Sequence, residues 1–282
     1  MARGIIVNVD MAAAWDGDEG DDWVRERERH DRAIRPYHEA LLGAVTIEAT
    51  DNVLDIGCGN GESTRDTARR AGEGSALGMD LSSRMIENAR AIASREGVRN
   101  AVFEHGDVQA YPFDDAVYDV CISRFGAMFF ADRDAAFANV ARSIRKDGLL
   151  GLVAWRSPLE NEWFQCVFGA LAAGRDLPMP APGTPGPYGL ADADVTRRAL
   201  EGAGFADVGF EPVDKPFWVG TDVTDAFAFL RASGIARGLT QGLEPDQKAR
   251  AFDTLEAAMN EHTSDAGVTF GSSAWLVTAR RT

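Results

Sequence analysis

Short apolar runs alternate with amphipathic segments between residues 51 and 155. Runs of this length, bounded by turn residues, are typical of buried strands. The runs cover residues 53–56, 75–80, 101–105, 149–155 and a stretch that starts at 118. The segments between them carry apolar residues at helical spacing and begin near residues that can cap a helix, namely Ser63 and Thr64, Ser82 or Ser83, and Asp132 or Asp134. Strands and helices that alternate in this way predict a parallel sheet with helices on both faces.

The two flanks of this region follow less regular patterns. We expect residues 1–20 to form a mobile or loosely packed arm and the charged stretch 21–32 to form a helix. Pro36 should interrupt or kink that helix, with a second helix over 37–45. Beyond residue 155, the pattern predicts helices over 160–173, 193–203, 222–232 and 244–262, strands over 205–216 and 272–280, and a proline-rich surface loop over 177–188.

The turn after the first apolar run has glycine at every second position, Gly57-Cys58-Gly59-Asn60-Gly61. Glycines in such a turn let the backbone approach a ligand closely. The spacing is not G-x-G-x-x-G, which holds a pyrophosphate, and no lysine follows the glycines as in a phosphate-binding loop. Asp55, two residues before Gly57, would repel a pyrophosphate. The turn therefore predicts a site for a cationic ligand.

Residues 53–61, V-L-D-I-G-C-G-N-G, resemble motif I of class I S-adenosylmethionine (SAM)-dependent methyltransferases, commonly V-L-D-[IV]-G-C-G-x-G. Residues 80–82, D-L-S, resemble motif II of the same family. Residues 106–113, G-D-V-Q-A-Y-P-F, resemble its G-D-[AV]-x-x-L-P-F segment, with Tyr111 where leucine is usual. Within the family, the chain resembles the ubiquinone/menaquinone-biosynthesis-like methyltransferases that act on small molecules.

The resemblance implies a Rossmann-like α/β fold, a doubly wound, seven-stranded, mostly parallel sheet with strand order 3-2-1-4-5-7-6. Strands near 208 and 275 would be the sixth and seventh. We expect an N-terminal helical cap over 1–48, a SAM-binding core over 49–155, and a third part, 156–282, that completes the sheet. Insertions at about 156–190 and 221–265 would cover the ligand cleft and set the choice of substrate.

The same resemblance assigns the contacts of the cofactor, SAM. Asp80 also follows the glycines by roughly the 20 residues at which a carboxylate takes ribose hydroxyls in nucleotide-binding folds. Asp107 would accept from the adenine amino group, and the N–H of Val108 would meet the ring. The methionine end would be held by Asp55, Gly57 and Ser123, and further contacts are expected from Cys58, Gly59, Leu81 and Met85.

Residues that face the methyl acceptor are predicted from position and apolar character. The loop after the fourth strand is rich in aromatic residues, and core packing is the alternative explanation for them. Arg124 would pair either with an acidic side chain of the protein or with an acidic group of the substrate. The substrate candidates are Trp15, Trp23, Arg124, Met128 and Phe129. No general base is identified; His30, Tyr37 and His38 are candidates by location only, and helix packing is the alternative for each.

The composition of the chain limits the classes of partner that it can bind. The formal net charge of −15 disfavours binding to nucleic acid and to anionic membranes, because both are polyanions. Three scattered cysteines show no metal-ligand spacing, so we expect reduced thiols and no metal. No apolar run approaches the roughly 20 residues of a membrane span, and the N-terminus does not look like a secretory signal. These features predict a cytoplasmic location.

The sequence therefore predicts a SAM-dependent methyltransferase that acts on a small, largely apolar molecule. Two alternatives remain. A non-catalytic SAM-binding or regulatory protein would keep the same cleft, because fold and cofactor site do not fix function. A nicotinamide-dependent oxidoreductase would also have a glycine-rich turn, but the G-x-G-x-G spacing argues against it.

Overall fold

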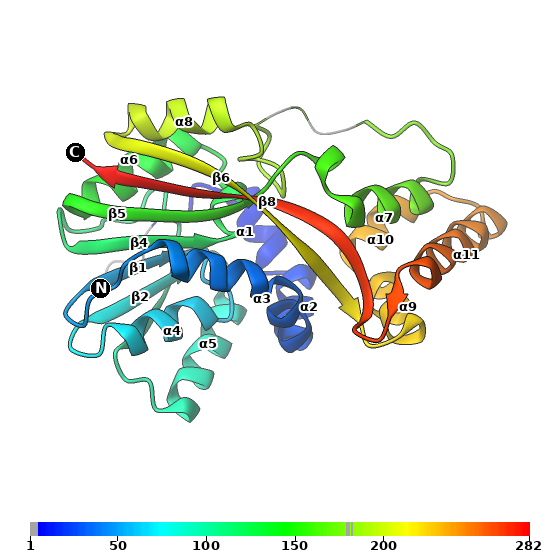
Figure 1. The fold of residues 1–282 in the computed structure, drawn as a ribbon, viewed down its shortest axis with the longest axis horizontal. Helices are drawn as coiled ribbons and strands as arrows, with labels where there is room; N and C mark the ends of the chain where they lie inside the picture. Colours follow the sequence, from blue (N-terminus) through cyan, green and yellow to red (C-terminus); the bar gives the residue numbers. More distant parts are fainter. Residues whose placement is uncertain (1–4, 179–180, 182) are drawn as a thin grey trace.

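The computed structural model describes residues 5–178, 181 and 183–282 (Figure 1). Its strands are β1 (Asn52–Ile56), β2 (Ser75–Asp80), β3 (Ala101–His105), β4 (Tyr118–Arg124), β5 (Ile144–Trp155), β6 (Phe205–Gly220), β7 (Thr263–Ser264) and β8 (Gly267–Arg281). Its α-helices are α1 (Val9–Trp15), α2 (Asp18–Arg25), α3 (Arg27–Ala44), α4 (Glu62–Arg70), α5 (Ser83–Glu96), α6 (Arg133–Ser143), α7 (Glu162–Ala172), α8 (Ala193–Gly202), α9 (Val223–Ala232), α10 (Gly234–Thr240) and α11 (Pro245–Glu261). Two 3₁₀ turns, η1 (Ala127–Phe129) and η2 (Pro158–Glu160), follow β4 and β5.

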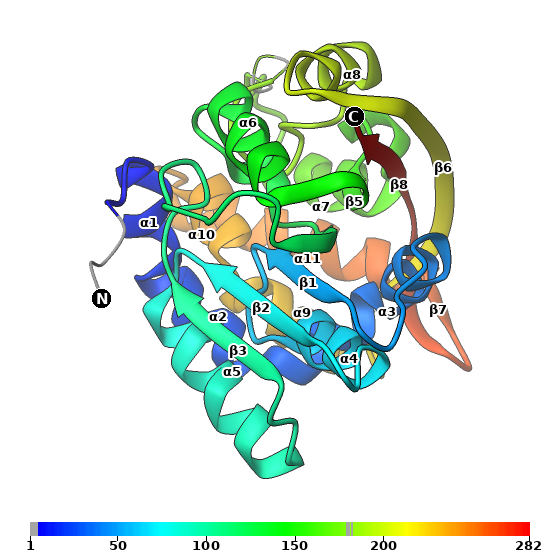
Figure 2. The same ribbon diagram turned by 90° about the vertical axis from the view of Figure 1, so that its left-hand side faces the viewer.

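The strands form one sheet in the order β3-β2-β1-β4-β5-β8-β6. The first five strands are parallel, whereas β8 runs antiparallel to β5 and β6 antiparallel to β8. Helices α3, α4 and α5 lie on one face, and α6 and α8 on the other (Figures 1 and 2). The predicted fold class and strand order are confirmed; the structure adds the two-residue strand β7, which pairs with β8.

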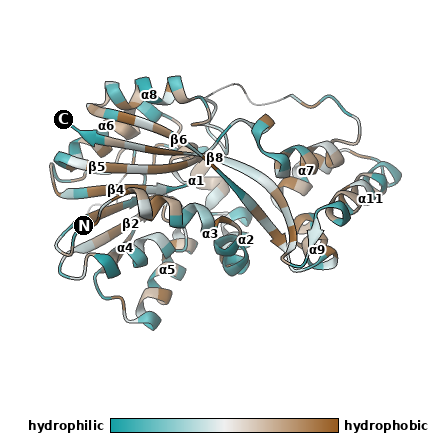
Figure 3. Ribbon diagram, viewed as in Figure 1, coloured by the Kyte–Doolittle hydropathy of each residue, from teal (hydrophilic) through white to brown (hydrophobic). Residues whose placement is uncertain are grey.

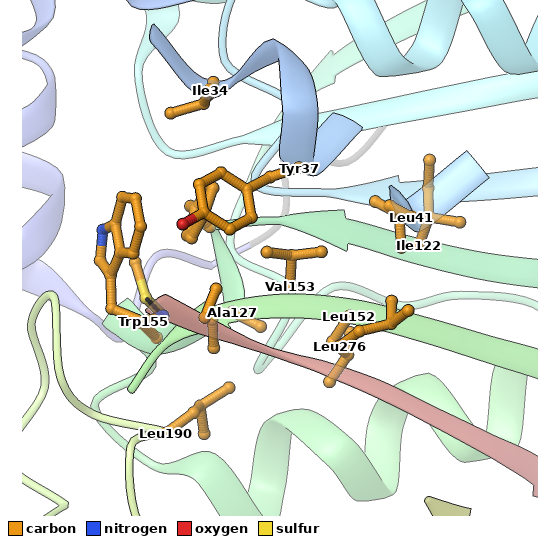
Figure 4. Close-up of a cluster of buried hydrophobic side chains, with 14 of the residues drawn as sticks. Ile34, Tyr37, Leu41, Ile122, Ala127, Leu152, Val153, Trp155, Leu190 and Leu276 are labelled. Atoms are coloured by element: carbon orange, nitrogen blue, oxygen red, sulfur yellow. Dashed lines mark hydrogen bonds between the residues drawn. The ribbon is translucent and has the colours of Figure 1, made fainter. Parts of the chain in front are cut away.

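The core lies between the sheet and these helices. Hydrophobic residues concentrate in the strands, while the outer faces of the helices are hydrophilic (Figure 3). On α3, Tyr37 and Leu41 are fully buried against β4 and β5, beside Val153 and Trp155 (Figure 4). Full burial of one such aliphatic side chain contributes about 1.5–3 kcal/mol. The N-terminal helix α3 is therefore packed into the core of the sheet.

The N-terminal region departs from the sequence-based prediction. Within residues 1–20, expected to form a loose arm, the described part contains α1 and the start of α2, and Asn8 is buried. The charged stretch 21–32 is divided at Glu26 between two helices. Pro36 lies inside the single helix α3 and does not end it. Buried residues on both sides of this proline, Ile34 and Tyr37, hold the two halves of α3 on the sheet and offset the lost hydrogen bond.

Two strands are longer than the pattern predicts. β6 and β8 stay paired from Phe205 opposite Arg281 to Gly220 opposite Val268, well beyond the other strands. This ribbon bends away from the sheet and carries α9, α10 and α11 at its far end (Figure 1). Helices α9, α10 and α11 are thus attached to the sheet through paired strands.

The remaining differences are local. Helix α6 ends at Ser143 because Ile144 already pairs with Tyr118, so residues 144–148 belong to β5. The short helix α10 was not predicted. The described residues of the proline-rich stretch form neither helix nor strand, as expected, whereas Pro180 and Pro182 lie outside the described residues. Among the described helices, none combines the length and the apolar character that crossing a membrane requires.

Candidate active site

The glycine turn lies between the end of β1 and the start of α4. Gly57, Gly59 and Gly61 all have positive φ, between +54° and +77°, a region that glycine enters without steric cost. A Cβ on Gly57 would stand 2.6 Å from the Cα of Gly126, in the loop after β4. The N–H groups of Gly57 and Cys58 both donate to the carbonyl of Met79, in β2. The ends of β1, β2 and β4 thus converge at this turn.

Asp80 ends β2 and anchors the turn. Its Oδ2 accepts from the N–H of Gly59 at 2.8 Å, and its Oδ1 accepts from the N–H of Ser82 at 2.8 Å. Burial raises the pKa of Asp80, and the backbone donors oppose that rise. Ser82 caps α5 by accepting from the N–H of Met85. The adjacent Leu81 accepts at its carbonyl from the ring of His105. The carboxylate that was predicted to take the ribose hydroxyls thus lies beside the glycine backbone.

Asp107 follows β3 and is almost fully buried. Its Oδ1 accepts from the N–H of Gln109 at 3.0 Å. Its Oδ2 accepts from the N–H groups of Val7 at 3.0 Å and Asn8 at 2.8 Å, about 100 residues away in the sequence. The neighbouring Val108 is also buried. In this structure the N-terminal segment therefore supplies donors to the carboxylate that was predicted to meet adenine.

Asp55, at the end of β1, is fully buried. Its Oδ2 accepts from the hydroxyl of Thr64 at 2.6 Å, whereas its Oδ1 has no hydrogen-bond partner. Burial raises the pKa of Asp55 to about 6. Ser123, at the end of β4, donates to the carbonyl of Ile56 at 2.7 Å and accepts from the N–H of Ala127. A buried carboxylate oxygen without a donor is costly unless a ligand supplies one.

Arg124 ends β4 and is buried between two carboxylates. It donates to Glu62, in the first turn of α4, and to Asp31 of α3 at 3.2 Å. Burial raises the pKa of Asp31 to about 6. Burial also acts to raise the pKa of Glu62, but the Arg124 charge holds it below its usual value. Of the two alternatives for Arg124, the structure shows a pairing with acids of the protein.

The aromatic substrate candidates occupy two places. Trp15 makes edge-to-face contacts with Trp23 and Phe129, with ring centroids 5.8 and 5.0 Å apart. The Trp23 carbonyl accepts from Asn60 of the glycine turn. Met128 is buried in the core, where its sulfur accepts from the N–H of Trp155 at 3.4 Å. Trp15, Trp23 and Phe129 thus form one cluster between the N-terminal helices and the turn η1, whereas Met128 lies in the core.

The three base candidates lie in different surroundings. Tyr37 is buried; its hydroxyl lies 2.6 Å from that of Ser272, and burial raises the pKa of Tyr37 to about 12. The ring of His38 is 2.9 Å from Asp66 and packs α3 on α4. His30 stacks on Trp23 at 3.9 Å, and burial lowers the pKa of His30 to about 4. Of the three, only His30 lies against a substrate candidate.

Sequence reasoning missed the partners that the N-terminal region brings to the site. Asp31 stands in a stretch dense in charges, where nothing distinguishes it from its neighbours. Val7 and Asn8 act through their main-chain N–H groups, which leave no mark in the sequence. Glu62 directly follows the last glycine of the turn. This position, in the first turn of α4, was the one signal in the sequence that Glu62 would lie near the site.

Comparisons with known proteins agree with this geometry. Residues 53–148 match a family model described as a methyltransferase domain. The uncharacterized methyltransferase YcgJ of Bacillus subtilis (strain 168) is 34% identical over 118 residues, which cover 42% of this chain and 46% of YcgJ. The sequence match thus spans less than half the length of that relative. Nocamycin O-methyltransferase of Saccharothrix syringae is 26% identical over 262 residues, which cover 88% of this chain and 91% of that protein.

Solved structures show the same fold. The crystal structure of YcgJ aligns with a TM-score of 0.56 at 18% identity, covering 89% of this chain and 98% of YcgJ. Phosphoethanolamine N-methyltransferase 2 of Haemonchus contortus, in complex with S-adenosyl-L-methionine, aligns with a TM-score of 0.59 at 14% identity, covering 98% of this chain and 60% of that one. The matched segment and the strand order are similar to those of class I, SAM-dependent methyltransferases.

The residues present fit SAM. The close approach of Gly57 to Gly126 leaves bare backbone at the strand ends. The unpartnered Oδ1 of Asp55 suits a cationic group, because a positive charge within about 4–6 Å favours the ionised carboxylate. Asp80 and Asp107 add acceptors on the two neighbouring strands. All three of these side chains are carboxylates, which suit a ligand that carries a sulfonium charge and an amino group.

Proposed function

We propose that this protein transfers the methyl group of SAM to a small, largely apolar molecule. The observation that carries the proposal is the placement of Asp55, Asp80 and Asp107 at or just beyond the ends of three adjacent parallel strands, around a turn of left-handed glycines. Ligands of open α/β sheets bind at these carboxyl ends of the strands. Asp55 would face the methionine end of the cofactor, Asp80 the ribose and Asp107 the adenine.

The bound cofactor supplies a methyl group activated by the sulfonium charge. The residues of this chain bind and orient the cofactor and the acceptor, and they exclude water from the site. Gly57 and Ser123 fix the methionine end, and the N-terminal helices, with Trp15 and Trp23, cover the site. Holding two reactants in line at near-attack distance can contribute up to about 7–11 kcal/mol. Positioning of the acceptor is therefore the main task of the cap.

An apolar acceptor follows from what surrounds the cleft. Phe129 is partly exposed beside Trp15, and Arg124 is already paired with Asp31 and Glu62. An anionic substrate group would have to displace one of these carboxylates. The net charge of −15 supports a small-molecule acceptor over nucleic acid, and we place the enzyme in the cytoplasm.

Calorimetry tests the cofactor. The protein should bind S-adenosylhomocysteine and not NAD; the reverse result would end the proposal. Asp80→Ala should weaken S-adenosylhomocysteine binding at least about 100-fold, because each hydrogen bond to a charged group is worth about 1.5–3 kcal/mol. Asp114→Ala removes an equal charge from an exposed turn and should leave the affinity unchanged. Thermal melting of both variants checks that they fold.

A non-catalytic SAM-binding protein is the second candidate, favoured by one observation: the Tyr37 hydroxyl and the His38 ring are both engaged inside the structure. Acceptors that are ionised at neutral pH need no base, so this observation restricts the acceptor without excluding catalysis. Incubation with SAM and a metabolite mixture, followed by mass spectrometry, separates the two. A product heavier by one methylene identifies an enzyme, whereas cofactor binding without such a product indicates a regulatory protein.

A further inference from the structure

The segment just before α1 occupies a carboxylate of the proposed cofactor site. The N–H groups of Val7 and Asn8 donate to Oδ2 of Asp107 at 3.0 and 2.8 Å, and Asn8 and Asp107 are almost fully buried. The side-chain amide of Asn8 donates to the carbonyl of Phe129 at 2.9 Å. The segment is therefore fastened both to the adenine side of the site and to the loop after β4.

The Oδ2 atom of Asp107 has no hydrogen-bonding capacity left. A carboxylate oxygen has two lone pairs, and Oδ2 already accepts from two main-chain donors. The other oxygen, Oδ1, faces the N–H of Gln109 in its own loop. An amino group of a bound ligand could reach Oδ2 only after Val7 or Asn8 has left it.

The contacts that hold this segment are mainly polar. Ile5, Val7 and Val9 are 74%, 52% and 64% exposed, and α1 contains no buried residue. Releasing the segment therefore exposes little new apolar surface, and its cost lies mainly in the hydrogen bonds to Asp107 and Phe129. These bonds can be replaced by water on one partner and by a ligand on the other.

We propose that the main-chain N–H groups of Val7 and Asn8 stand in for the amino group of adenine, so that the cofactor binds Asp107 by displacing residues 5–8. The inference rests on the proposed function, which assigns Asp107 to the base. The displaced segment also releases the carbonyl of Phe129, so arrival of the cofactor frees the loop that faces the acceptor. The apparent affinity for the cofactor is lowered by the fraction of molecules in which the segment is bound.

Replacement of one donor tests this competition. Asn8→Pro removes the N–H, and the backbone φ of −84° at this position is close to the value that proline imposes. The variant should bind S-adenosylhomocysteine about tenfold more tightly, which corresponds to about 1.4 kcal/mol. The affinity of the variant for adenosine should rise by the same factor, because adenosine contains the same adenine group as S-adenosylhomocysteine. Val7→Ala keeps both N–H groups and should bind as the wild type does.

Hydrogen–deuterium exchange gives a readout that does not depend on a variant. The amides of Val7 and Asn8 should exchange slowly in the free protein and faster when S-adenosylhomocysteine saturates it. Binding of the ligand with both amides still protected would overturn the inference and leave the proposed function intact, as would unchanged or weaker binding by Asn8→Pro. Failure of the wild type to bind the ligand at all would overturn both.

Discussion

The two ends of the proposed site, named after the adenosine and methionine parts of SAM that they are proposed to bind, hold their carboxylates in different ways. At the adenosine end, Asp80 and Asp107 accept hydrogen bonds from main-chain N–H groups. At the methionine end, Asp55 has one side-chain donor and one unpartnered oxygen, and Arg124 stands among carboxylate side chains. The first end is fixed by the backbone, whereas the second is a network of ionisable side chains whose charges are open to substitution and pH.

The difference follows from where each end lies. Asp80 and Asp107 lie at or just beyond the carboxyl ends of β2 and β3. The loops that follow these strands turn back, so their main-chain N–H groups can donate to the two carboxylates. Asp55 of β1 and Arg124 of β4 lie beside α4, and the partners of both are side chains, namely Thr64 and Glu62 of α4 and Asp31 of α3. Buried charges in such a place must be paired to be tolerated. Stability should therefore depend on charge at the methionine end and on backbone geometry at the adenosine end.

The largest effect should come from removing the arginine that two carboxylates of the methionine end share. Arg124→Met takes from Asp31 the cation it pairs with and leaves Glu62 with the exposed Arg35, which should lower the free energy of unfolding by about 3–5 kcal/mol at pH 7. Urea denaturation measures it. The matched control is Arg25→Met, which breaks an exposed ion pair with Asp22 and should change stability by about 0.5 kcal/mol or less. Equal losses in the two variants would show that the charges around Arg124 matter no more to stability than an exposed ion pair does.

An effect of intermediate size should appear as pH dependence. Burial raises the pKa of Asp55 to about 6 from 3.8. Between about pH 4 and 6 the unfolded chain has lost this proton and the folded chain still holds it, so stability falls as pH rises. The slope is about 1.4 kcal/mol per pH unit for one proton. Asp55→Asn should reduce that fall by up to about 3 kcal/mol across the window. Parallel curves for the two proteins would show that Asp55 titrates normally.

The smallest effect concerns the adenosine end. Ser82→Ala removes the side-chain cap of α5 and should cost about 1 kcal/mol of stability. The N–H of Ser82 that donates to Asp80 is kept. Affinity for S-adenosylhomocysteine, measured by calorimetry, should therefore stay within about twofold. A loss of affinity much larger than the loss of stability would mean that the hydroxyl itself contacts the ligand.

Local patterns were enough to predict much of the sheet. The bounds of β2 and β3 coincide with the apolar runs, because a buried parallel strand needs a short continuous run with turn residues on both sides. The acids at the strand ends could be found for the same reason, since Asp55 lies in the last two residues of one such run and Asp80 ends another. The helix α10 was missed because its seven residues contain two glycines and give no helical period.

The partners of those acids could not be predicted. Val7 meets Asp107 across 100 positions and Arg124 meets Asp31 across 93. Such pairs depend on where the N-terminal helices settle on the finished sheet. For α1, which buries no residue, the sequence shows no apolar stripe to indicate a docking face. The core of the fold could thus be predicted segment by segment from the sequence, whereas the packing of the N-terminal helices over the site could not.

The ribbon formed by β6 and β8 has a consequence for how such a protein can diversify. Its two strands enter and leave the outer helices at adjacent points, Gly220 and Val268, in fixed register. We expect that everything between these points can be exchanged as a cassette with two junctions when the ion pairs of Arg29 with Asp225 and of Asp22 with Arg237 are kept. A chimaera built at these junctions should take on a new acceptor preference while it keeps its methyl donor.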